Sequence, residues 1–167
     1  MGKGLFADEL AASAYDIPYE RLYEEGFRGI IYDIDNTLVL PDAPADDRAY
    51  GLVEKLKKIG FSIITVSNNK GPRVSSFAEA VRVPYVPKAA KPSRRGYLKA
   101  MEIMGTTPAA TLVIGDQIYT DIWGGNRAGA YTILTSPFTD KEEIQIILKR
   151  IIEKPVLWLY RMTHHEN

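Results

Sequence analysis

The chain has 167 residues, 46% of them hydrophobic and 25% charged, which suits one globular domain with its own core. Basic and acidic residues number 21 each, so the charge balance gives no reason to expect a nucleic-acid binder. The absence of cysteine excludes disulfides, thiol catalysis and thiolate metal sites. No apolar run is long enough to span a membrane, and the N-terminus turns acidic too early for a signal peptide, so we expect a cytoplasmic protein.

The first third of the chain is predicted to contain two helices and one strand. Residues 8–26 have a helical pattern with a break at Pro18, and a buried strand is expected over residues 29–33. After a polar loop, the apolar spacing predicts a helix over residues 47–58. Gly60 suits the left-handed position that ends such a helix.

The rest of the chain continues to alternate between strands and helices. Strands are predicted at 61–66, 84–86, 111–114 and 130–134, with helices at 72–81, 92–104 and 141–153. This β-α-β-α-β-α-β-α-β order predicts an α/β fold, with a mostly parallel sheet and helices on both faces, as a single domain over residues 1–167. In such sheets the ligand site lies beyond the carboxyl ends of the strands.

Two aspartates, Asp33 and Asp35, lie inside an apolar run from Ile30 to Val39. A run of this kind is typical of a strand that is buried on both faces. Ionised carboxylates there are costly unless a cation or hydrogen-bond donors compensate them. Without cysteine, and with histidine only at His164 and His165, an oxygen-binding cation such as Mg²⁺ is the favoured partner.

Polar side chains also follow the other predicted strands, and they should meet Asp33 and Asp35 at one crevice. They are Ser67, Asn68, Lys91 and Asp116. A nucleophilic aspartate near a phosphate needs a metal and a lysine to screen repulsion, and a second carboxylate can protonate the leaving oxygen. Asp121 is a candidate for a second metal-site carboxylate or for an orienting residue.

Several of these residues have plainer interpretations that the sequence leaves open. Ser67 could cap the following helix, and Asp121 could simply begin a helical turn. Lys88 competes with Lys91 for the cationic role, and Thr37 could either orient Asp33 or only pack. Three downstream glycines suit turns and close approaches better than a phosphate cradle: Gly124, Gly125 and Gly129.

Four segments resemble, in order and spacing, the motifs of haloacid dehalogenase (HAD) superfamily phosphatases. They are Asp33-Ile34-Asp35-Asn36-Thr37-Leu38, Ser67 after an apolar strand, Lys91-Pro92, and Gly115-Asp116-Gln117-Ile118-Tyr119-Thr120-Asp121. Two stretches are similar to the YqeG-like subgroup of class IIIA: Val66-Ser67-Asn68-Asn69, and residues 115–129 with Gly124-Gly125-Asn126-Arg127-Ala128-Gly129. Four ordered motifs are far more specific than one Asp-x-Asp pair.

The resemblance implies a three-layer, Rossmann-like HAD fold and a role for each matched residue. Asp33 would attack phosphorus and form an aspartyl-phosphate, while Asp35 would act as general acid and then as base. Mg²⁺ would be held by Asp33, by Asp35 through its backbone carbonyl, by Asp116 and, as a further candidate, by Asp121. The implied substrate-binding residues are Thr37, Ser67, Asn68 and Lys91.

Many members of the superfamily carry a cap domain, but the intervals between the motifs here have no room for one. An uncapped site suits a phosphate on a large partner, such as a lipid head group at a membrane. Some YqeG-like relatives dephosphorylate phosphatidylglycerophosphate, so the resemblance implies that substrate. The main rivals are a phosphatase of soluble sugar or nucleotide phosphates and a phospho-aspartate signalling module, against which Asp35 argues because an acid/base would hasten loss of the phosphoryl group.

The C-terminal flank suggests a peripheral contact with the inner face of the membrane. Residues 149–161 join basic residues to an aromatic, apolar stretch, and residues 155–167 could lie in a bilayer interface, where tryptophan and tyrosine are favoured. Leu5 and Phe6 could add a second contact. The alternative, in which this tail packs on the core or on another subunit, remains equally open.

Overall fold

The computed structural model describes residues 3–138, in which six strands form one sheet in the order β1-β6-β5-β2-β3-β4. Every neighbouring pair of strands is parallel. The strands are β1 (Glu9–Ala11), β2 (Gly29–Tyr32), β3 (Ser62–Val66), β4 (Tyr85–Val86), β5 (Thr111–Gly115) and β6 (Tyr131–Thr135). The predicted parallel α/β architecture is confirmed.

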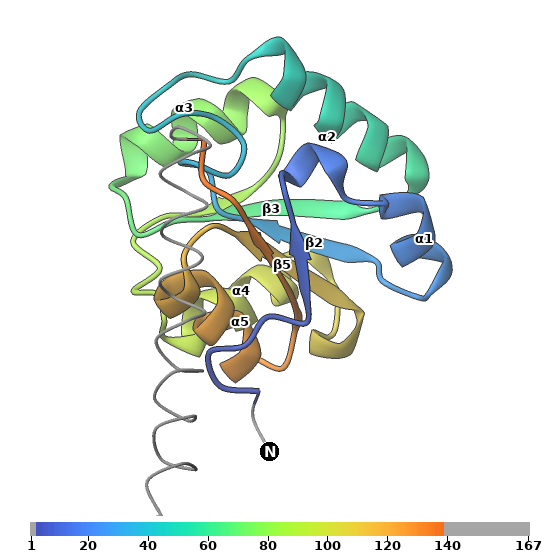
Figure 1. Ribbon diagram of the computed structural model, residues 1–167. Coiled ribbons are helices and arrows are strands. Elements are labelled where there is room, and N and C mark those ends of the chain that lie inside the picture. The colour runs from blue at the N-terminus through green and yellow to red at the C-terminus, as the bar shows by residue number, and fades with distance from the viewer. Residues whose placement is uncertain (1–2, 139–167) are drawn as a thin grey trace, which may run out of the picture. The chain divides into compact units, whose positions relative to one another are not determined.

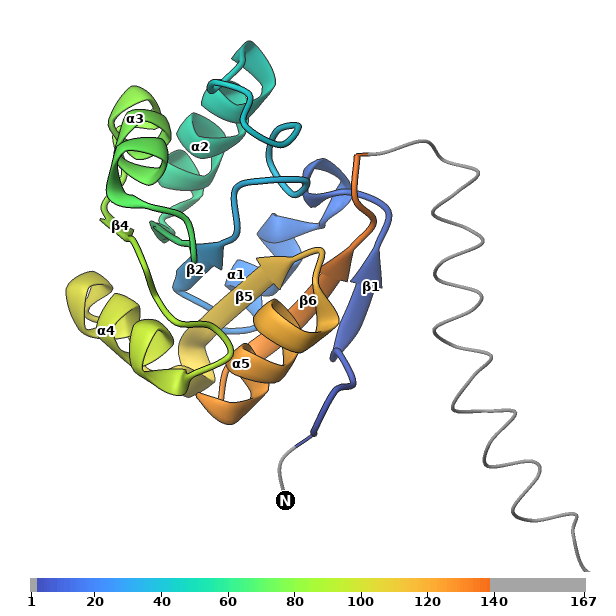
Figure 2. The same cartoon turned by 90° about the vertical axis from the view of Figure 1, so that its left-hand side faces the viewer.

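Helices cover both faces of the sheet, so this part of the chain has three layers. In Figures 1 and 2, α2 and α3 lie on one side of the sheet and α4 and α5 on the other. The helices are α1 (Tyr19–Glu24), α2 (Asp47–Ile59), α3 (Gly71–Val81), α4 (Arg94–Met104) and α5 (Trp123–Arg127). Short 3₁₀ turns lie at η1 (Ala14–Asp16) and η2 (Pro108–Ala110), and a π-helical turn, η3 (Ile118–Ile122), precedes α5.

Strand β2 is the centre of the core. Ile30 and Tyr32 pack in the cluster under α1, α2 and α3, whereas Ile31 packs in the cluster that includes Tyr97 and Met101 of α4. All four residues of β2 are buried. The strand is therefore buried on both faces, as its apolar run predicts, and Asp33 follows it directly.

The prediction of a helix before Pro18 is wrong. Residues Glu9–Ala11 form the edge strand β1, which pairs with β6. Asp8 reinforces this pairing, because its side chain accepts a hydrogen bond from the backbone N–H of Thr132 at 2.9 Å. Glu-Leu-Ala is a good helix former, but pairing with a strand far away in the sequence overrides local propensity. Pro18 does mark a boundary, since it caps α1.

The other predicted elements lie within a few residues of the observed ones. Gly60 ends α2 in the left-handed conformation with φ 119°, and Asp46 caps the start of that helix. Helix α4 begins at Arg94 behind a Ser93 cap, so Pro92 precedes the helix instead of lying in its first turn. The predicted helix at 141–153 and the predicted interfacial tail at 155–167 lie outside the described residues, and the single-domain assignment stays a prediction.

Within residues 3–138 no cap domain covers the sheet. Only a loop and α2 separate β2 from β3, and α3, β4 and α4 separate β3 from β5. The carboxyl edge of the central strands therefore opens directly into a polar pocket of about 290 Å³.

Candidate active site

Three carboxylates and one ammonium group meet beyond the carboxyl ends of β2 and β5. The Nζ of Lys91 lies 2.9 Å from Oδ1 of Asp33 and 2.6 Å from Oδ1 of Asp121. Asp33, Asp116 and Asp121 each bring an oxygen within 4.8 Å of the others. The lysine and Asp121 side chains are almost fully buried, at 4% and 2% exposure.

The backbone after β5 explains how Asp121 reaches this cluster. A Cβ on Gly115 would lie 2.3 Å from the Oδ2 of Asp121, so only glycine leaves space for that carboxylate. The backbone N–H of Gln117 donates to the same oxygen at 3.1 Å. The π-helical turn η3 then returns the chain, with the N–H groups of Asp121 and Ile122 both directed at the Gln117 carbonyl.

Burial and mutual repulsion perturb the charges of the cluster. Burial, with the charge of Asp121, raises the pKa of Asp33 to about 8, although Lys91 opposes the shift. Burial, again with Asp121, raises the pKa of Asp116 to about 6. Burial alone would lower the pKa of Lys91, but the charges of Asp121 and Asp33 outweigh it and the pKa lies above its ordinary value. A single ammonium thus compensates three carboxylates incompletely.

This cluster fits a hard divalent cation. Carboxylate oxygens are the ligands that Mg²⁺ prefers, and the three that converge here carry more negative charge than Lys91 neutralises. Asp33 and Asp116 are the better placed ligands, because both oxygens of Asp121 already accept hydrogen bonds, from Lys91 and from Gln117. Asp121 thus orients Lys91, and its part in holding a metal stays a prediction.

Asp35 lines the same pocket as Asp33 but has different hydrogen-bond partners. Its Oδ1 accepts hydrogen bonds from Arg73 at 2.7 Å and from the backbone N–H of Asp42 at 3.1 Å. Its Oδ2 accepts one from the side-chain amide of Asn69 at 2.6 Å. The Asp35 carboxylate is therefore directed away from the other three, so any contribution of this residue to a metal would come from its backbone carbonyl.

The remaining predicted substrate-binding residues line or support the pocket. Ser67 is buried and its Oγ accepts a hydrogen bond from the N–H of Asn69, and it does not cap α3, whose N-cap is Lys70. The Asn68 side chain donates to the carbonyl of Lys91 at 3.2 Å and accepts from its N–H at 2.7 Å. Asn68 thus positions the chain that carries Lys91.

The structure also shows the contacts of Lys88 and Thr37, whose roles the sequence leaves open. Lys88 is exposed, whereas Lys91 reaches Asp33. Thr37 is buried, and its Oγ1 lies 3.4 Å from Asp116, a long hydrogen bond, so it supports that aspartate in place of Asp33.

The glycines after the last motif allow close packing. A Cβ on Gly124 would meet the ring of Tyr97 at 2.4 Å, and one on Gly125 would meet Thr132 at 2.7 Å. Gly129 has a positive φ of 84°. Tyr97, packed against Gly124, donates its hydroxyl to the carbonyl of Thr120 at 2.8 Å and so fixes the turn that carries Asp121.

The sequence analysis assigns no role to four residues that shape the site. Asn69 and Arg73 bind Asp35, Gln117 binds Asp121, and Tyr97 holds the turn around Asp121. Asn69 could have been found, because it follows Ser67 and Asn68 in a polar group after a strand. Nothing in the local sequence pattern marks Arg73 or Tyr97, which reach the site through the packing of α3 and α4.

A parallel sheet with a buried aspartate, a lysine and further carboxylates at its carboxyl edge is suited to displacement at a phosphate. A family model described as HAD-hydrolase-like matches residues 88–147. The chain is 35% identical over 164 residues, 98% of its length, to the probable phosphatase YqeG of Bacillus subtilis, of which it covers 95%. The chain therefore belongs to the YqeG family of HAD superfamily phosphatases.

Two curated relatives from photosynthetic organisms are more distant. The chain is 28% identical to chloroplastic phosphatidylglycerophosphate phosphatase 1 of Chlamydomonas reinhardtii, with 88% of this chain and 58% of that protein covered. It is also 28% identical to the chloroplastic/mitochondrial phosphatidylglycerophosphate phosphatase 1 of Arabidopsis thaliana, with 78% and 40% covered. It thus spans little more than half of the first and less than half of the second.

Solved structures with lower identity share the fold. NagD from Escherichia coli K-12 superposes with a TM-score of 0.57 at 13% identity, over 71% of this chain and 91% of that one. The cobalt-bound deoxy-D-mannose-octulosonate 8-phosphate phosphatase YrbI of Haemophilus influenzae gives 0.56 at 15% identity, over 75% of each chain. The HAD fold expected from the motifs is confirmed.

Proposed function

We propose that this phosphatase uses Mg²⁺ and an aspartyl-phosphate on Asp33 to convert phosphatidylglycerophosphate to phosphatidylglycerol. The observation that carries the proposed chemistry is the contact of Lys91 with both Asp33 and Asp121, beside a second aspartate two residues from the first. The substrate is supported by the names of the two more distant relatives.

In the first half of the reaction, an oxygen of Asp33 attacks phosphorus while Lys91 neutralises negative charge on the phosphoryl group. Asp35 gives a proton to the leaving glycerol oxygen as its bond to phosphorus breaks. In the second half, Asp35 takes a proton from water, which attacks the aspartyl-phosphate and releases inorganic phosphate and free Asp33. Ser67 lines the pocket and would hold a phosphoryl oxygen.

Mg²⁺ would be held by Asp33 and Asp116, with Asp121 adjacent, and by the backbone carbonyl of Asp35. When bound, it would neutralise charge on the phosphoryl oxygens and on the attacking carboxylate. The raised pKa values of Asp33 and Asp116 without metal accord with a site whose carboxylates are arranged for a cation.

The shape of the pocket accords with a substrate that is mostly outside it. Its volume of about 290 Å³ is lined by polar side chains together with Pro41, so it suits a head group and leaves acyl chains outside. The apolar side chains of Leu40, Leu5 and Phe6 are more than a third exposed and could touch a lipid surface, as could the predicted tail at 155–167. No helix of the described residues is long and apolar enough to cross a membrane.

The test is phosphate release from phosphatidylglycerophosphate in mixed micelles, with Mg²⁺ or with a chelator, for the wild type and Asp33→Asn. Release that needs Mg²⁺ and is lost in the variant supports the proposal. Hydrolysis of a soluble ester but not of the lipid would keep the chemistry and overturn the substrate. A stable phosphorylated Asp33 without turnover would favour a signalling role instead.

A further inference from the structure

Arg73, on the first turn of α3, is bound to the proposed acid/base residue. Its guanidinium donates to Oδ1 of Asp35 at 2.7 Å, and the two side chains are only 17% and 22% exposed. Asn69, four residues earlier, donates to the other oxygen of the same carboxylate at 2.6 Å. Two donors from the junction between the loop and α3 thus bind the two oxygens of the Asp35 carboxylate.

The pair differs from an ordinary surface ion pair. Exposed pairs between flexible side chains contribute little to stability. The guanidinium here belongs to a largely buried side chain, and its Nε is buried without a hydrogen-bond partner among the described residues, which costs free energy. The ring of Phe77 lies beside it, 6.0 Å from ring centroid to guanidinium carbon. An arrangement that accepts this cost suggests a role beyond stability.

The geometry also distinguishes the two oxygens of Asp35. Oδ1 accepts two hydrogen bonds, from Arg73 and from the N–H of Asp42, whereas Oδ2 accepts one, from Asn69. Each carboxylate oxygen can accept two. Oδ2 therefore keeps a site for the proton that moves to and from the substrate.

We propose that Arg73 is a positioning residue that fixes the plane of the Asp35 carboxyl group so that Oδ2 faces the leaving oxygen. The inference rests on the proposed function, in which Asp35 gives its proton to the departing alkoxide while the P–O bond breaks. Arg73 is neither among the residues that line the pocket nor part of the carboxylate cluster. It acts only through Asp35, by holding Oδ1.

This role predicts an effect that depends on the leaving group. An alkyl alcohol is a poor leaving group and needs the proton, whereas nitrophenol leaves readily without one. Disturbing the acid should therefore slow hydrolysis of an alkyl phosphate much more than that of p-nitrophenyl phosphate.

The experiment compares Arg73→Gln and Arg73→Lys with the wild type on phosphatidylglycerophosphate and on p-nitrophenyl phosphate. We expect Arg73→Gln to lower kcat on the lipid roughly 10- to 100-fold, to change KM less than about 3-fold, and to change kcat on the aryl ester less than about 3-fold. Arg73→Lys should recover part of the loss. In an Asp35→Asn background, Arg73→Gln should cause little further loss. The matched control is Arg82→Gln, an exposed arginine at the other end of the same helix.

Three results would overturn the inference. A rise in KM for the lipid with unchanged kcat would make Arg73 a substrate-binding residue. Equal losses of kcat on both esters, with a lower unfolding temperature, would make its role structural. Additive losses in the double variant would separate it from Asp35. If the wild type hydrolyses neither ester, the proposed function itself fails, and that outcome is distinguished by the absence of any Asp33-dependent turnover.

Discussion

Asp33 and Asp35 are two residues apart on one loop, yet they lie in opposite environments. Asp33 faces two other carboxylates and shares one buried lysine with Asp121, so its charge is poorly compensated. Asp35 faces three donors from the protein, and no other acid group is bonded to it among the described residues. In the proposed reaction, Asp33 binds the metal and the phosphoryl group, whereas the Asp35 carboxylate is held by donors from the protein.

The difference shows how one short segment places two aspartates in different environments. A residue in an extended chain points opposite to its neighbour and to the same side as the residue two positions on. The loop breaks this alternation after Ile34, where the N–H groups of Thr37, Leu38 and Val39 all turn back to one carbonyl and Asn36 takes a positive φ of 62°. The turn thereby separates two carboxylates that a regular strand would direct to the same side.

The largest expected effect is the loss of phosphatase activity when Asp33 or Asp35 is replaced. Asp33→Asn should lose turnover on both an alkyl phosphate and p-nitrophenyl phosphate, because no nucleophile remains. Asp35→Asn should lose about 10²- to 10⁴-fold on the alkyl ester and clearly less on the aryl ester. Steady-state rates of phosphate release measure both. If Asp35→Asn lowers the rate of phosphate release equally on the two esters, the predicted difference in role between Asp33 and Asp35 is wrong.

The second prediction compares how much two sets of ion pairs contribute to the free energy of unfolding: Lys91 with Asp33 and Asp121, and Arg73 with Asp35. Lys91→Met leaves buried carboxylates unpaired, so it should destabilise the metal-free protein by about 3–5 kcal/mol. Arg73→Met should cost less, about 1 kcal/mol, because Asp35 keeps two other donors and the buried, unpartnered Nε is removed. Urea unfolding with chelator present measures both. Adding Asp121→Asn to Lys91→Met should recover part of the loss, and similar costs for the two single variants would contradict the contrast.

The third prediction concerns pH and Mg²⁺. The pKa values of about 8 for Asp33 and about 6 for Asp116 exceed the 3.8 of the free side chain. The metal-free folded protein therefore holds protons that the unfolded chain has released, and it loses stability as pH rises from about 4 to about 8.

If Mg²⁺ binds these carboxylates as proposed, it displaces their protons. The stabilisation that it gives should then grow over the same pH window, toward about 2.7 kcal/mol at a hundredfold excess over its dissociation constant. Thermal unfolding with Mg²⁺ and with chelator measures this difference at each pH. Asp33→Asn should flatten the dependence, and a Mg²⁺ effect that shrinks as pH rises would refute the assignment of the metal to these carboxylates.

The smallest expected effect tests how the carboxylate cluster is built. Gly115→Ala would place a methyl group against the carboxylate of Asp121, so we expect a loss of about 1–3 kcal/mol and weaker Mg²⁺ stabilisation. Gly51→Ala, in the exposed middle of α2 with no neighbour near the new Cβ, should instead gain about 0.5–1 kcal/mol. Thermal unfolding of both variants decides, and no loss for Gly115→Ala would show that Asp121 is free to move.

The sequence predicts the central fold well because local signals and tertiary structure agree there. Apolar runs mark β2, β3 and β5, and polar residues after them converge on one pocket. It fails where long-range pairing overrides local preference, as in β1, whose partner lies more than 120 residues further along the chain. The sequence also does not predict the contact of Arg73 with Asp35, because that contact depends on how α3 packs and not on any spacing within the helix.

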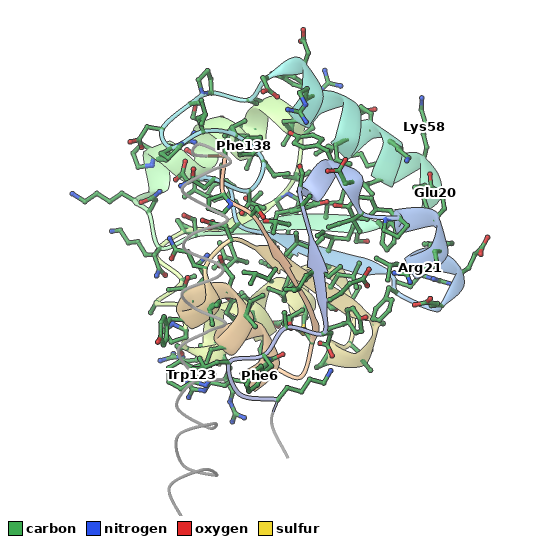
Figure 3. All side chains as sticks on the ribbon, in the orientation of Figure 1. Phe6, Glu20, Arg21, Lys58, Trp123 and Phe138 are labelled. Atoms are coloured by element: carbon green, nitrogen blue, oxygen red, sulfur yellow. The ribbon has the colours of Figure 1, made fainter. Side chains whose placement is uncertain are left out.

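The position of strand β1 affects how soluble a shortened form of this protein would be. It lies at the outer edge of the sheet on β6, and Asn126 of α5 holds the preceding segment through the carbonyl oxygens of Gly4 and Phe6. Figure 3 labels Phe6 and Trp123, the first residue of α5, at the same end of the molecule. A shortened chain that begins after Ala11 would keep every proposed catalytic residue but expose the unpaired backbone edge of β6, which is a template for association with other chains. Such a chain should retain its chemistry while it is monomeric and lose solubility as its concentration rises.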